Sequence, residues 1–125
     1  MIVSVRKRFP GRARKVIFSL WGPGLLGLSK GLAVVDEWVD VDNLSEVAWQ
    51  ALRNVDWRRD VVTLEVPVDH LDQAAPPQAY GRKIGLDAAA KGPEEGHSMG
   101  WPERIEMSPE IRALVDRRWE EYGLT

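Results

Sequence analysis

Apolar residues over the first 68 positions follow two spacings in turn, and this alternation most constrains the fold. Residues 2–5, 31–35 and 62–68 form short runs rich in β-branched side chains, which is typical of strands. Residues 12–21 and 44–55 repeat apolar side chains every three or four positions, which is typical of helices that pack on one face. Helices that connect successive strands favour a largely parallel sheet. The sequence therefore predicts an α/β fold, a layered β-α-β-α-β domain with a mostly parallel or mixed sheet.

Local signals predict where these elements begin and end. The Gly-Pro-Gly at 22–24 ends the first helix. Asn43 and Glu46 have the spacing of a capping box, which predicts that the second helix begins at Asn43. Because the run 31–35 is continuously apolar, we expect this strand to be buried on both faces near the centre of the sheet. Pro67 places the third strand at an edge, or lies close to the end of that strand.

Composition limits the classes of protein to which this chain can belong. With 125 residues, 44% of them hydrophobic, six tryptophans and a net charge of -2, we expect one folded, soluble domain. The chain has no cysteine, which excludes disulfides, thiolate zinc sites and cysteine nucleophiles and fits a cytoplasmic location. No apolar run approaches the roughly 18 residues that a membrane span needs, so we expect no membrane span.

A long segment without regular patterns follows the third predicted strand. Residues 69–106 are dominated by Pro, Gly, Ala and charged side chains, whereas connections in compact domains are usually about 4 to 6 residues long. We expect this segment to be an ordered loop that docks on a partner surface. Ser108 as N-cap and Pro109 in the first turn then predict a final helix over residues 108–122, with one apolar and one charged side.

Two glycine motifs match known site patterns by spacing alone. Residues 22–27 fit G-x-G-x-x-G, but the dinucleotide motif follows a strand and opens a helix, whereas here a helix precedes and a strand follows. Residues 27–31 fit G-x-S-x-G, but a nucleophile elbow turns from a strand into a helix, and Ser29 leads into a strand. We interpret both motifs as turns.

Two clusters of like charge each have two interpretations. The four acidic residues within 36–42 could bind a hard cation through oxygen ligands, or could favour the N-terminus of the helix that follows. The six Lys and Arg residues within 6–15 could contact nucleic acid. Because the net charge of the chain is negative, a solvated or interface surface is the favoured interpretation of the basic cluster.

Charged residues in the long segment suggest one enzymatic hypothesis. A histidine near carboxylates can act as an acid or a base, and His70 lies between Asp69 and Asp72. Together with Lys83 and Asp87, these residues would form a small independent active site. The alternatives are a histidine that is oriented by neighbouring backbone and a salt bridge between Lys83 and Asp87 that holds the loop closed.

Aromatic residues toward the C-terminus are candidates for a protein interface. Buried Trp dominates many interfaces and is also common in cores, and both interpretations apply to Trp101 and Trp119. The final helix could pair with its copy across a two-fold axis through Trp119 and Tyr122. Such pairing would make the chain a stand-alone oligomerisation module.

Four blocks of this sequence resemble the C-terminal part of the UbiD-like decarboxylases, the 3-polyprenyl-4-hydroxybenzoate carboxy-lyase family. The blocks are SVRKRFPGRARKVIFSLWG at 4–22, KGLAVVDEWVDVDNLSEVAWQALRNVDWRRD at 30–60, PVDHLDQAAPP at 67–77 and GRKIGLDAAAK at 81–91. The last three are the most specific because several such motifs occur in the family's order. The chain departs from the family's patterns at Glu37, Trp38, Ala75 and Ala89, which leaves the substrate subgroup open.

The resemblance also implies a reaction and its cofactors. The parent enzymes remove carbon dioxide from 4-hydroxybenzoate-type aromatic or unsaturated acids, and ubiquinone biosynthesis contains the namesake reaction. The family uses prenylated FMN with a divalent metal and potassium, and an Arg and two Glu in an upstream flavin-binding domain do the acid and base work. No residue of this chain matches that constellation, so the resemblance assigns it no catalytic, cofactor-binding or metal-binding residue.

The resemblance therefore implies that residues 1–125 are the C-terminal domain, or a fragment, of such a decarboxylase. Its partners would be the flavin-binding domain and further copies in a homo-oligomer, without nucleic acid. Two alternatives stay open, namely a stand-alone oligomerisation or interaction module and a small enzyme with a site in residues 69–87.

Overall fold

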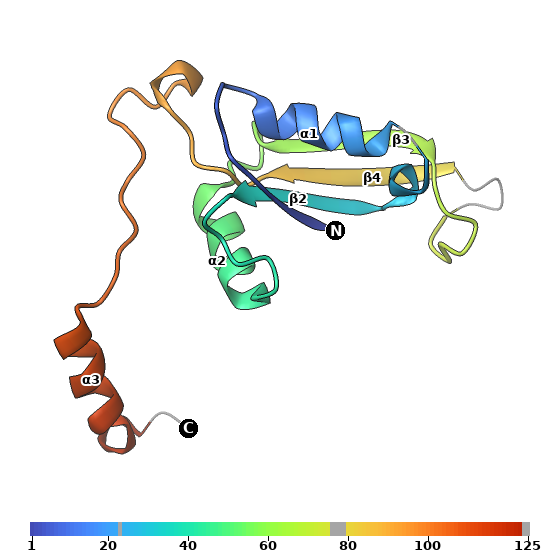
Figure 1. Cartoon of the computed structure of the whole chain (residues 1–125). Coiled ribbons are helices and arrows are strands. Elements are labelled where there is room, and N and C mark those ends of the chain that lie inside the picture. The colour runs from blue at the N-terminus through green and yellow to red at the C-terminus, as the bar shows by residue number, and fades with distance from the viewer. Residues whose placement is uncertain (23, 76–79, 124–125) are drawn as a thin grey trace.

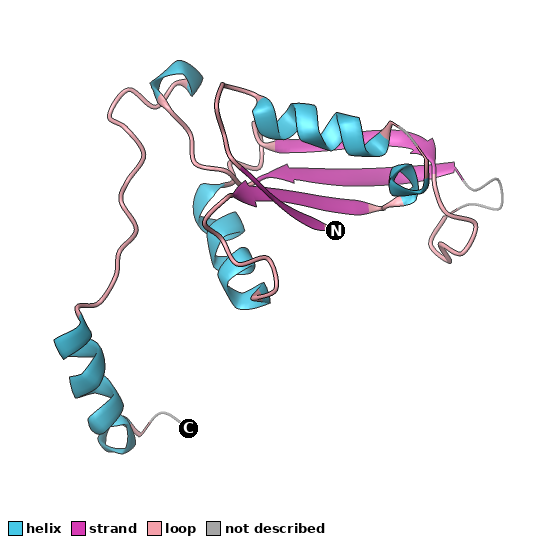
Figure 2. Ribbon diagram, viewed as in Figure 1, coloured by secondary structure: helices cyan, strands magenta, loops and turns pink. Residues whose placement is uncertain are grey.

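A four-stranded sheet with one helix on each face forms the body of the protein. The computed structural model describes residues 1–22, 24–75 and 80–123. Helix α1 covers one face of the sheet and α2 lies on the other (Figure 1, Figure 2). The elements, in chain order, are β1 (Ile2–Val5), α1 (Arg12–Trp21), η1 (Leu25–Leu28), β2 (Gly31–Asp36), α2 (Leu44–Asn54), β3 (Val61–Pro67), β4 (Tyr80–Asp87), η2 (Pro93–Glu95), α3 (Pro109–Arg117) and η3 (Trp119–Tyr122).

The sheet is mixed and mostly parallel, which confirms the predicted fold class. Its strand order is β1-β2-β4-β3, with β1, β2 and β4 parallel to one another and β3 antiparallel to β4. Strand β2 therefore has neighbours on both sides, as its continuous apolar sequence predicts. Strand β3 lies at an edge and ends at Pro67, in agreement with the expected effect of proline.

The two faces of β2 carry two separate apolar cores. Leu32 and Val34 pack against Ile17 and other residues of α1 on one face. Val35 packs against Val47 and other residues around α2 on the opposite face. A strand that is buried on both faces needs apolar side chains at successive positions, and this explains the unbroken apolar run in the sequence.

The capping signals act as predicted. The side chain of Asn43 accepts a hydrogen bond from the backbone N–H of Glu46 at 3.2 Å, and α2 begins at the next residue, Leu44. Helix α1 ends at Trp21, where the N–H of Gly22 donates to the carbonyl of Phe18 at 3.0 Å. Residue 23, the proline of the expected stop signal, lies outside the described residues.

The prediction of a continuous loop over residues 69–106 is wrong, because β4 occupies part of it. Strand β4 pairs with β2 on one side and with β3 on the other, so it is internal to the sheet. Its three fully buried side-chain positions are Lys83, Gly85 and Asp87, which alternate as in any strand but are not apolar. Hydrophobic periodicity therefore gives no signal for this strand.

The absence of a side chain at Gly85 lets α1 pack closely on β4. A Cβ atom at this position would lie 2.8 Å from Ile17 Cγ2 and 3.0 Å from the ring of Trp21. Contacts this short force neighbouring side chains or backbone to move. The close approach of helix and sheet therefore depends on glycine here.

Residues 96–123 form a C-terminal arm that extends away from the sheet (Figure 1). Helix α3 has the predicted cap, in which Ser108 Oγ accepts from the N–H of Ile111 at 3.3 Å. The final helix is confirmed, although its last turn is the separate 3-10 helix η3. No residue of α3 is buried, and Trp119 is 51% exposed, so nothing in the described part of the chain covers its apolar side. No helix among the described residues is long and apolar enough to cross a membrane.

We predict that Gly85→Ala lowers the free energy of unfolding by about 1–3 kcal/mol, because the added methyl group overpacks the contact with α1. Gly92→Ala is the matched control, because a Cβ at Gly92 meets no heavy atom within 4 Å, and we expect it to change the value by less than about 0.5 kcal/mol. Chemical denaturation of the three proteins measures both effects. Equal midpoints for the two variants would contradict the prediction.

Candidate functional site at the carboxyl ends of the strands

Polar residues gather where β1, β2 and β4 end. Lys7 follows β1, Asp36 ends β2 and Asp87 ends β4. Because the chain enters helices on opposite faces of the sheet after β1 and after β2, a crevice opens between these strand ends, as in other α/β sheets. A cavity of about 500 Å³ lies here, lined by residues that include Lys7, Asp36, Lys91 and Glu95.

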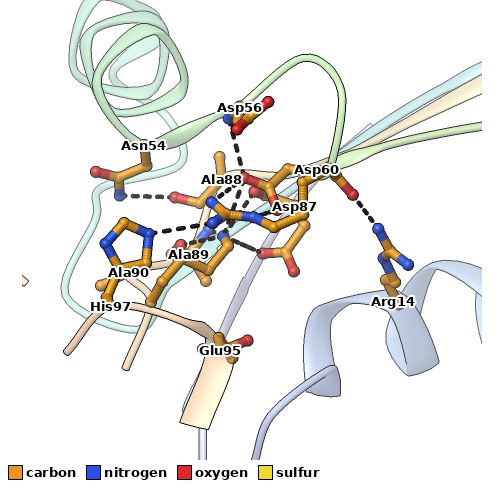
Figure 3. A network of polar contacts seen from close by, with 12 residues as sticks. Arg14, Asn54, Asp56, Asp60, Asp87, Ala88, Ala89, Ala90, Glu95 and His97 are labelled. Carbon is orange, nitrogen blue, oxygen red and sulfur yellow. Dashed lines mark hydrogen bonds and ion pairs between the residues drawn. The ribbon is translucent and has the colours of Figure 1, made fainter. Parts of the chain in front are cut away.

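A buried lysine is the centre of this cluster. The Lys91 side chain is only 2% exposed, and its Nζ lies 3.0 Å from Asp87 Oδ1 and 3.8 Å from Asp60 Oδ2. Figure 3 labels these two aspartates, which lie close together in the polar network. Nζ also donates to the backbone carbonyls of Asp87 at 3.0 Å and Ala89 at 2.5 Å. The ammonium group thus donates all three of its N–H groups, to one carboxylate and two carbonyls, and Asp60 is a second carboxylate nearby.

Asp60 receives a second cation from its neighbour in the chain. Arg59 donates from Nε to Oδ1 at 2.8 Å and from Nη2 to Oδ2 at 2.7 Å, and the N–H of Asp56 donates to Oδ2 at 2.9 Å. Burial raises the pKa of Asp60, but the hydrogen bonds from Arg59 and Asp56 and the charge of Lys91 outweigh it, so its pKa lies below the usual value. Asp60 is therefore held in its charged form. The guanidinium of Arg14 on α1 donates to the carbonyl of Arg59, which ties α1 to the cluster.

Asp36 connects β2 to the segment after β4. Its Oδ2 accepts a hydrogen bond from the N–H of Ala90 at 2.8 Å. Burial raises the pKa of Asp36, and the Ala90 hydrogen bond and the charges of Lys7 and Lys91 offset this only in part. Lys7 in turn donates to the carbonyl of Ala90 at 2.5 Å and forms an ion pair with Glu95. The segment 88–95 is thus fixed to the ends of β1 and β2.

The charges of this cluster compensate one another. Lys91 lies between Asp60 and Asp87, Arg59 pairs with Asp60, and Lys7 pairs with Glu95. A buried ion pair is stable only if each charge has a partner of good geometry. The cluster therefore joins the ends of three strands, and Asp36 is its one charged member without an ion-pair partner among the described residues.

The structure places the other predicted site residues at the opposite end of the sheet. Asp72 forms a 2.9 Å ion pair with Lys30, which lies just before β2, and Asp69 accepts the N–H of Leu71 at 2.9 Å. His70 is exposed. These contacts turn the backbone after β3 and pair Asp72 with Lys30 instead of with His70.

The predicted salt bridge between Lys83 and Asp87 is wrong. Positions four apart in a strand are separated by about 13 Å, so the two side chains lie at different ends of β4. Lys83 is 1% exposed and donates to the carbonyl of Gly27, whereas Asp87 pairs with Lys91. Burial lowers the pKa of Lys83. The five residues of the enzymatic hypothesis are thus not brought into one site.

The aromatic candidates lie on the C-terminal arm, and Trp101 contacts Asn54, whose Nδ2 donates to the carbonyl of Ala88 just after β4 at 2.9 Å. Trp101 is partly buried, its Nε1 donates to Asn54 Oδ1 at 3.2 Å, and its ring meets His97 edge-on with centroids 4.6 Å apart. Trp119 and Tyr122 are 51% and 42% exposed, so they lie on a surface and not in a core of the described residues.

Sequence reasoning missed the residues at the centre of the cluster. Lys91 and Asp60 are 31 positions apart, and only the fold brings them together. The one available signal was that Asp87 and Lys91 both belong to the sequence block 81–91. A lysine four residues after an aspartate has no specific meaning until the aspartate is known to end an internal strand.

Comparison with known proteins identifies the family. Residues 1–88 match the family model described as 3-octaprenyl-4-hydroxybenzoate carboxy-lyase C-terminal domain. The chain belongs to this family. The resemblance to the UbiD-like decarboxylases that the sequence blocks indicate is thereby confirmed.

Relatives of this UbiD C-terminal domain are much longer than the chain. A protein of Aquifex aeolicus is 44% identical over 122 residues, which are 98% of this chain and 25% of the relative. A protein of Aeropyrum pernix is 45% identical over 125 residues, with the same two coverages. Both are described only as uncharacterized proteins. The chain thus spans about a quarter of the length of these relatives.

Solved structures of UbiD-class enzymes have the same fold over this region. The vanillic acid decarboxylase of Sedimentibacter hydroxybenzoicus is 27% identical with a TM-score of 0.78, and the match covers 98% of this chain and 27% of that one. The UbiD-class enzyme HmfF of Pelotomaculum thermopropionicum, solved in complex with FMN, is 25% identical with a TM-score of 0.70, and the match covers 85% and 23%.

The described residues do not fit the metal that the family implies. They contain no group of three His, Asp or Glu side chains that could hold a metal ion. In the acidic stretch 36–42, Asp36 points inward to Ala90 and Asp40 accepts the N–H of Asp42 at 3.0 Å. We therefore assign no metal to these residues.

We predict that Lys91→Met lowers the free energy of unfolding by about 3–5 kcal/mol, because it leaves Asp60 and Asp87 buried without their shared cation. Lys30→Met is the matched control, because it removes a lysine from an ion pair in which the lysine is 54% exposed, and we expect a much smaller loss. Thermal or chemical denaturation at neutral pH compares the variants. A Lys91 variant as stable as the Lys30 variant would show that the cluster does not hold the strand ends together.

Proposed function

We propose that this chain is the C-terminal domain of a UbiD-class decarboxylase and supports packing and oligomerisation of that enzyme. The parent would be a carboxy-lyase that acts on 4-hydroxybenzoate-type aromatic or unsaturated acids. The observation that carries the proposal is the coverage, because 98% of the chain aligns with only a quarter of the length of each of two relatives. The remaining three quarters of such a protein would supply the flavin-binding domain.

The charge cluster supports a structural role for the domain. Decarboxylation needs an electron sink for the developing carbanion, and in cofactor enzymes the cofactor supplies it. In the described residues the charges around Lys91 pair with one another, Asp36 and Lys83 are buried against backbone groups, and no group of side chains could hold a metal ion. Prenylated FMN, divalent metal and potassium would therefore bind in the rest of the enzyme, and the isolated chain would be inactive.

The C-terminal arm supports a role in assembly. Ile111, Trp119 and Tyr122 are each more than 40% exposed on the apolar side of α3 and η3. Burial of such side chains contributes about 1.5–3 kcal/mol each when it is complete. An apolar helix side with this exposure gains stability from contact with another domain or another subunit.

We predict that this chain associates with the first three quarters of the Aquifex aeolicus relative when the two are expressed together. The 44% identity to that relative makes a shared interface reasonable. Co-purification and mass determination measure the complex. Decarboxylation assays with prenylated FMN, manganese and a 4-hydroxybenzoate-type acid then compare the complex with each part. Carbon dioxide release by the isolated chain would overturn the structural role, and failure to co-purify would argue against the domain assignment.

The oligomerisation module is the second candidate, and the exposed apolar side of α3 favours it. We predict that light scattering detects a dimer or larger oligomer, and that Trp119→Ala and Tyr122→Ala shift it toward monomer. Trp57→Ala is the matched control, because Trp57 is 61% exposed but lies on the body of the protein between α2 and β3. A monomer at high concentration would exclude this candidate.

A further inference from the structure

Two tryptophans and a glutamate on the α2 side of the body enclose an arginine of the C-terminal arm. Trp38 lies in the turn after β2, and Glu46 and Trp49 lie on α2. The guanidinium carbon of Arg104 is 5.5 Å from the centroid of the Trp38 ring and 5.4 Å from that of Trp49. We call Trp38, Glu46 and Trp49 the aromatic cage.

The chemistry of the cage suits a planar cation. Indole rings attract a guanidinium group through their negative faces, and Trp is the strongest of the aromatic residues in this respect. Arg104 Nη1 also lies 3.0 Å from Glu46 Oε1, and the Glu46 side chain is only 17% exposed. A carboxylate beside two aromatic rings matches both the charge and the N–H groups of arginine. On its own segment Arg104 also contacts Glu106, with Nε 3.1 Å from Oε1.

A second arginine holds the arm backbone next to the cage. The Arg53 guanidinium carbon lies 5.0 Å from the centroid of the Trp49 ring. Its Nη2 donates to the carbonyls of Pro102 at 2.5 Å and Glu103 at 3.0 Å. The arm therefore meets α2 over residues 102–104, and α3 begins only five residues after Arg104. Beyond Arg104 every residue up to the start of α3 is exposed.

The position of α3 follows from this contact. Because the chain from Ile105 to Ser108 has no buried residue, the last point at which the arm is fixed to the body is the cage. Arg104 and Glu46 are 58 positions apart in the chain, so the contact depends on the tertiary fold. The arm would leave the body in another direction if the cage were empty.

We propose that Trp38, Glu46 and Trp49 form a guanidinium-binding site whose ligand is Arg104 of the same chain, and that this site is the latch that fixes the C-terminal arm. The site is specific for a planar cation that can stack between the rings and donate to the carboxylate. An empty cage would accept another guanidinium compound, whereas an ammonium group would bind it less well. This inference concerns the arm of the chain itself and holds whether or not a decarboxylase partner exists.

The first experiment removes the ligand. In Arg104→Ala we expect limited proteolysis within residues 96–108 to become about tenfold faster or more, because two cation–π contacts and an ion pair are lost. The denaturation midpoint of the body should stay unchanged. Arg104→Lys should release the arm nearly as much. Arg118→Ala is the matched control, because Arg118 has a similar ring contact with Tyr122 and an ion pair with Glu121, but both lie within the arm. Unchanged proteolysis in Arg104→Ala would overturn the proposal.

The second experiment refills the site. The Arg104→Ala chain is labelled with ¹⁵N and titrated with N-methylguanidinium or with an unlabelled peptide of residues 100–107. We expect the indole N–H signals of Trp38 and Trp49 to shift, and the peptide to restore protection of α2. A peptide with Ala in place of Arg104 should bind at least tenfold more weakly, and a Glu46→Gln chain about two- to fivefold more weakly. Equal binding of the arginine and alanine peptides would show that backbone contacts alone hold the arm and would refute a guanidinium site.

Discussion

The ion cluster around Lys91 is the contact on which the organisation of the sheet depends. Its members come from the end of β4, the turn before β3 and the segment after β4, and Arg14 links it to α1. Two buried carboxylates at this position would repel each other strongly without the ammonium group between them. Because replacement of one partner leaves an uncompensated charge, the cluster holds the turn before β3 to the end of β4, beyond the strand pairing itself.

The layered fold explains why this charge lies at the strand ends. Strand β2 is buried on both faces, so its positions along the sheet take apolar side chains and the charged side chains lie at the strand ends. After β1 and β2 the chain turns to opposite faces of the sheet, and the backbone groups in the crevice between them need hydrogen-bond partners. For Ala90 the side chains of Asp36 and Lys7 supply them, and Lys7 also pairs with Glu95. A crevice that holds ligands in many α/β proteins is here lined by the chain's own charged residues, beside a cavity of about 500 Å³.

The elements that the sequence predicted are those in which the buried positions carry apolar side chains. The apolar stripe of α1, the continuous run of β2 and the cap at Asn43 each reflect a local rule that the tertiary structure keeps. Strand β4 was missed because its buried positions are Lys83, Gly85 and Asp87, each required by a long-range contact: the Gly27 carbonyl, the packing of Ile17 and the ammonium of Lys91. The aromatic cage was missed for the same reason, since nothing near Arg104 in the sequence indicates Trp38 or Trp49.

The Lys91 cluster and the contact at Arg104 differ in strength, and this difference suits a domain that joins a larger assembly. The cluster at Lys91 is closed and costs several kcal/mol to disrupt. The latch at Arg104 is partly exposed, and two cation–π contacts of about 0.5–1 kcal/mol with one surface ion pair of about 0.2–1 kcal/mol give about 1–3 kcal/mol in total. Full burial of even two apolar side chains of α3 against a partner contributes as much or more. The latch therefore sets the default direction of α3, and a partner surface that binds α3 elsewhere can displace Arg104 without unfolding the body.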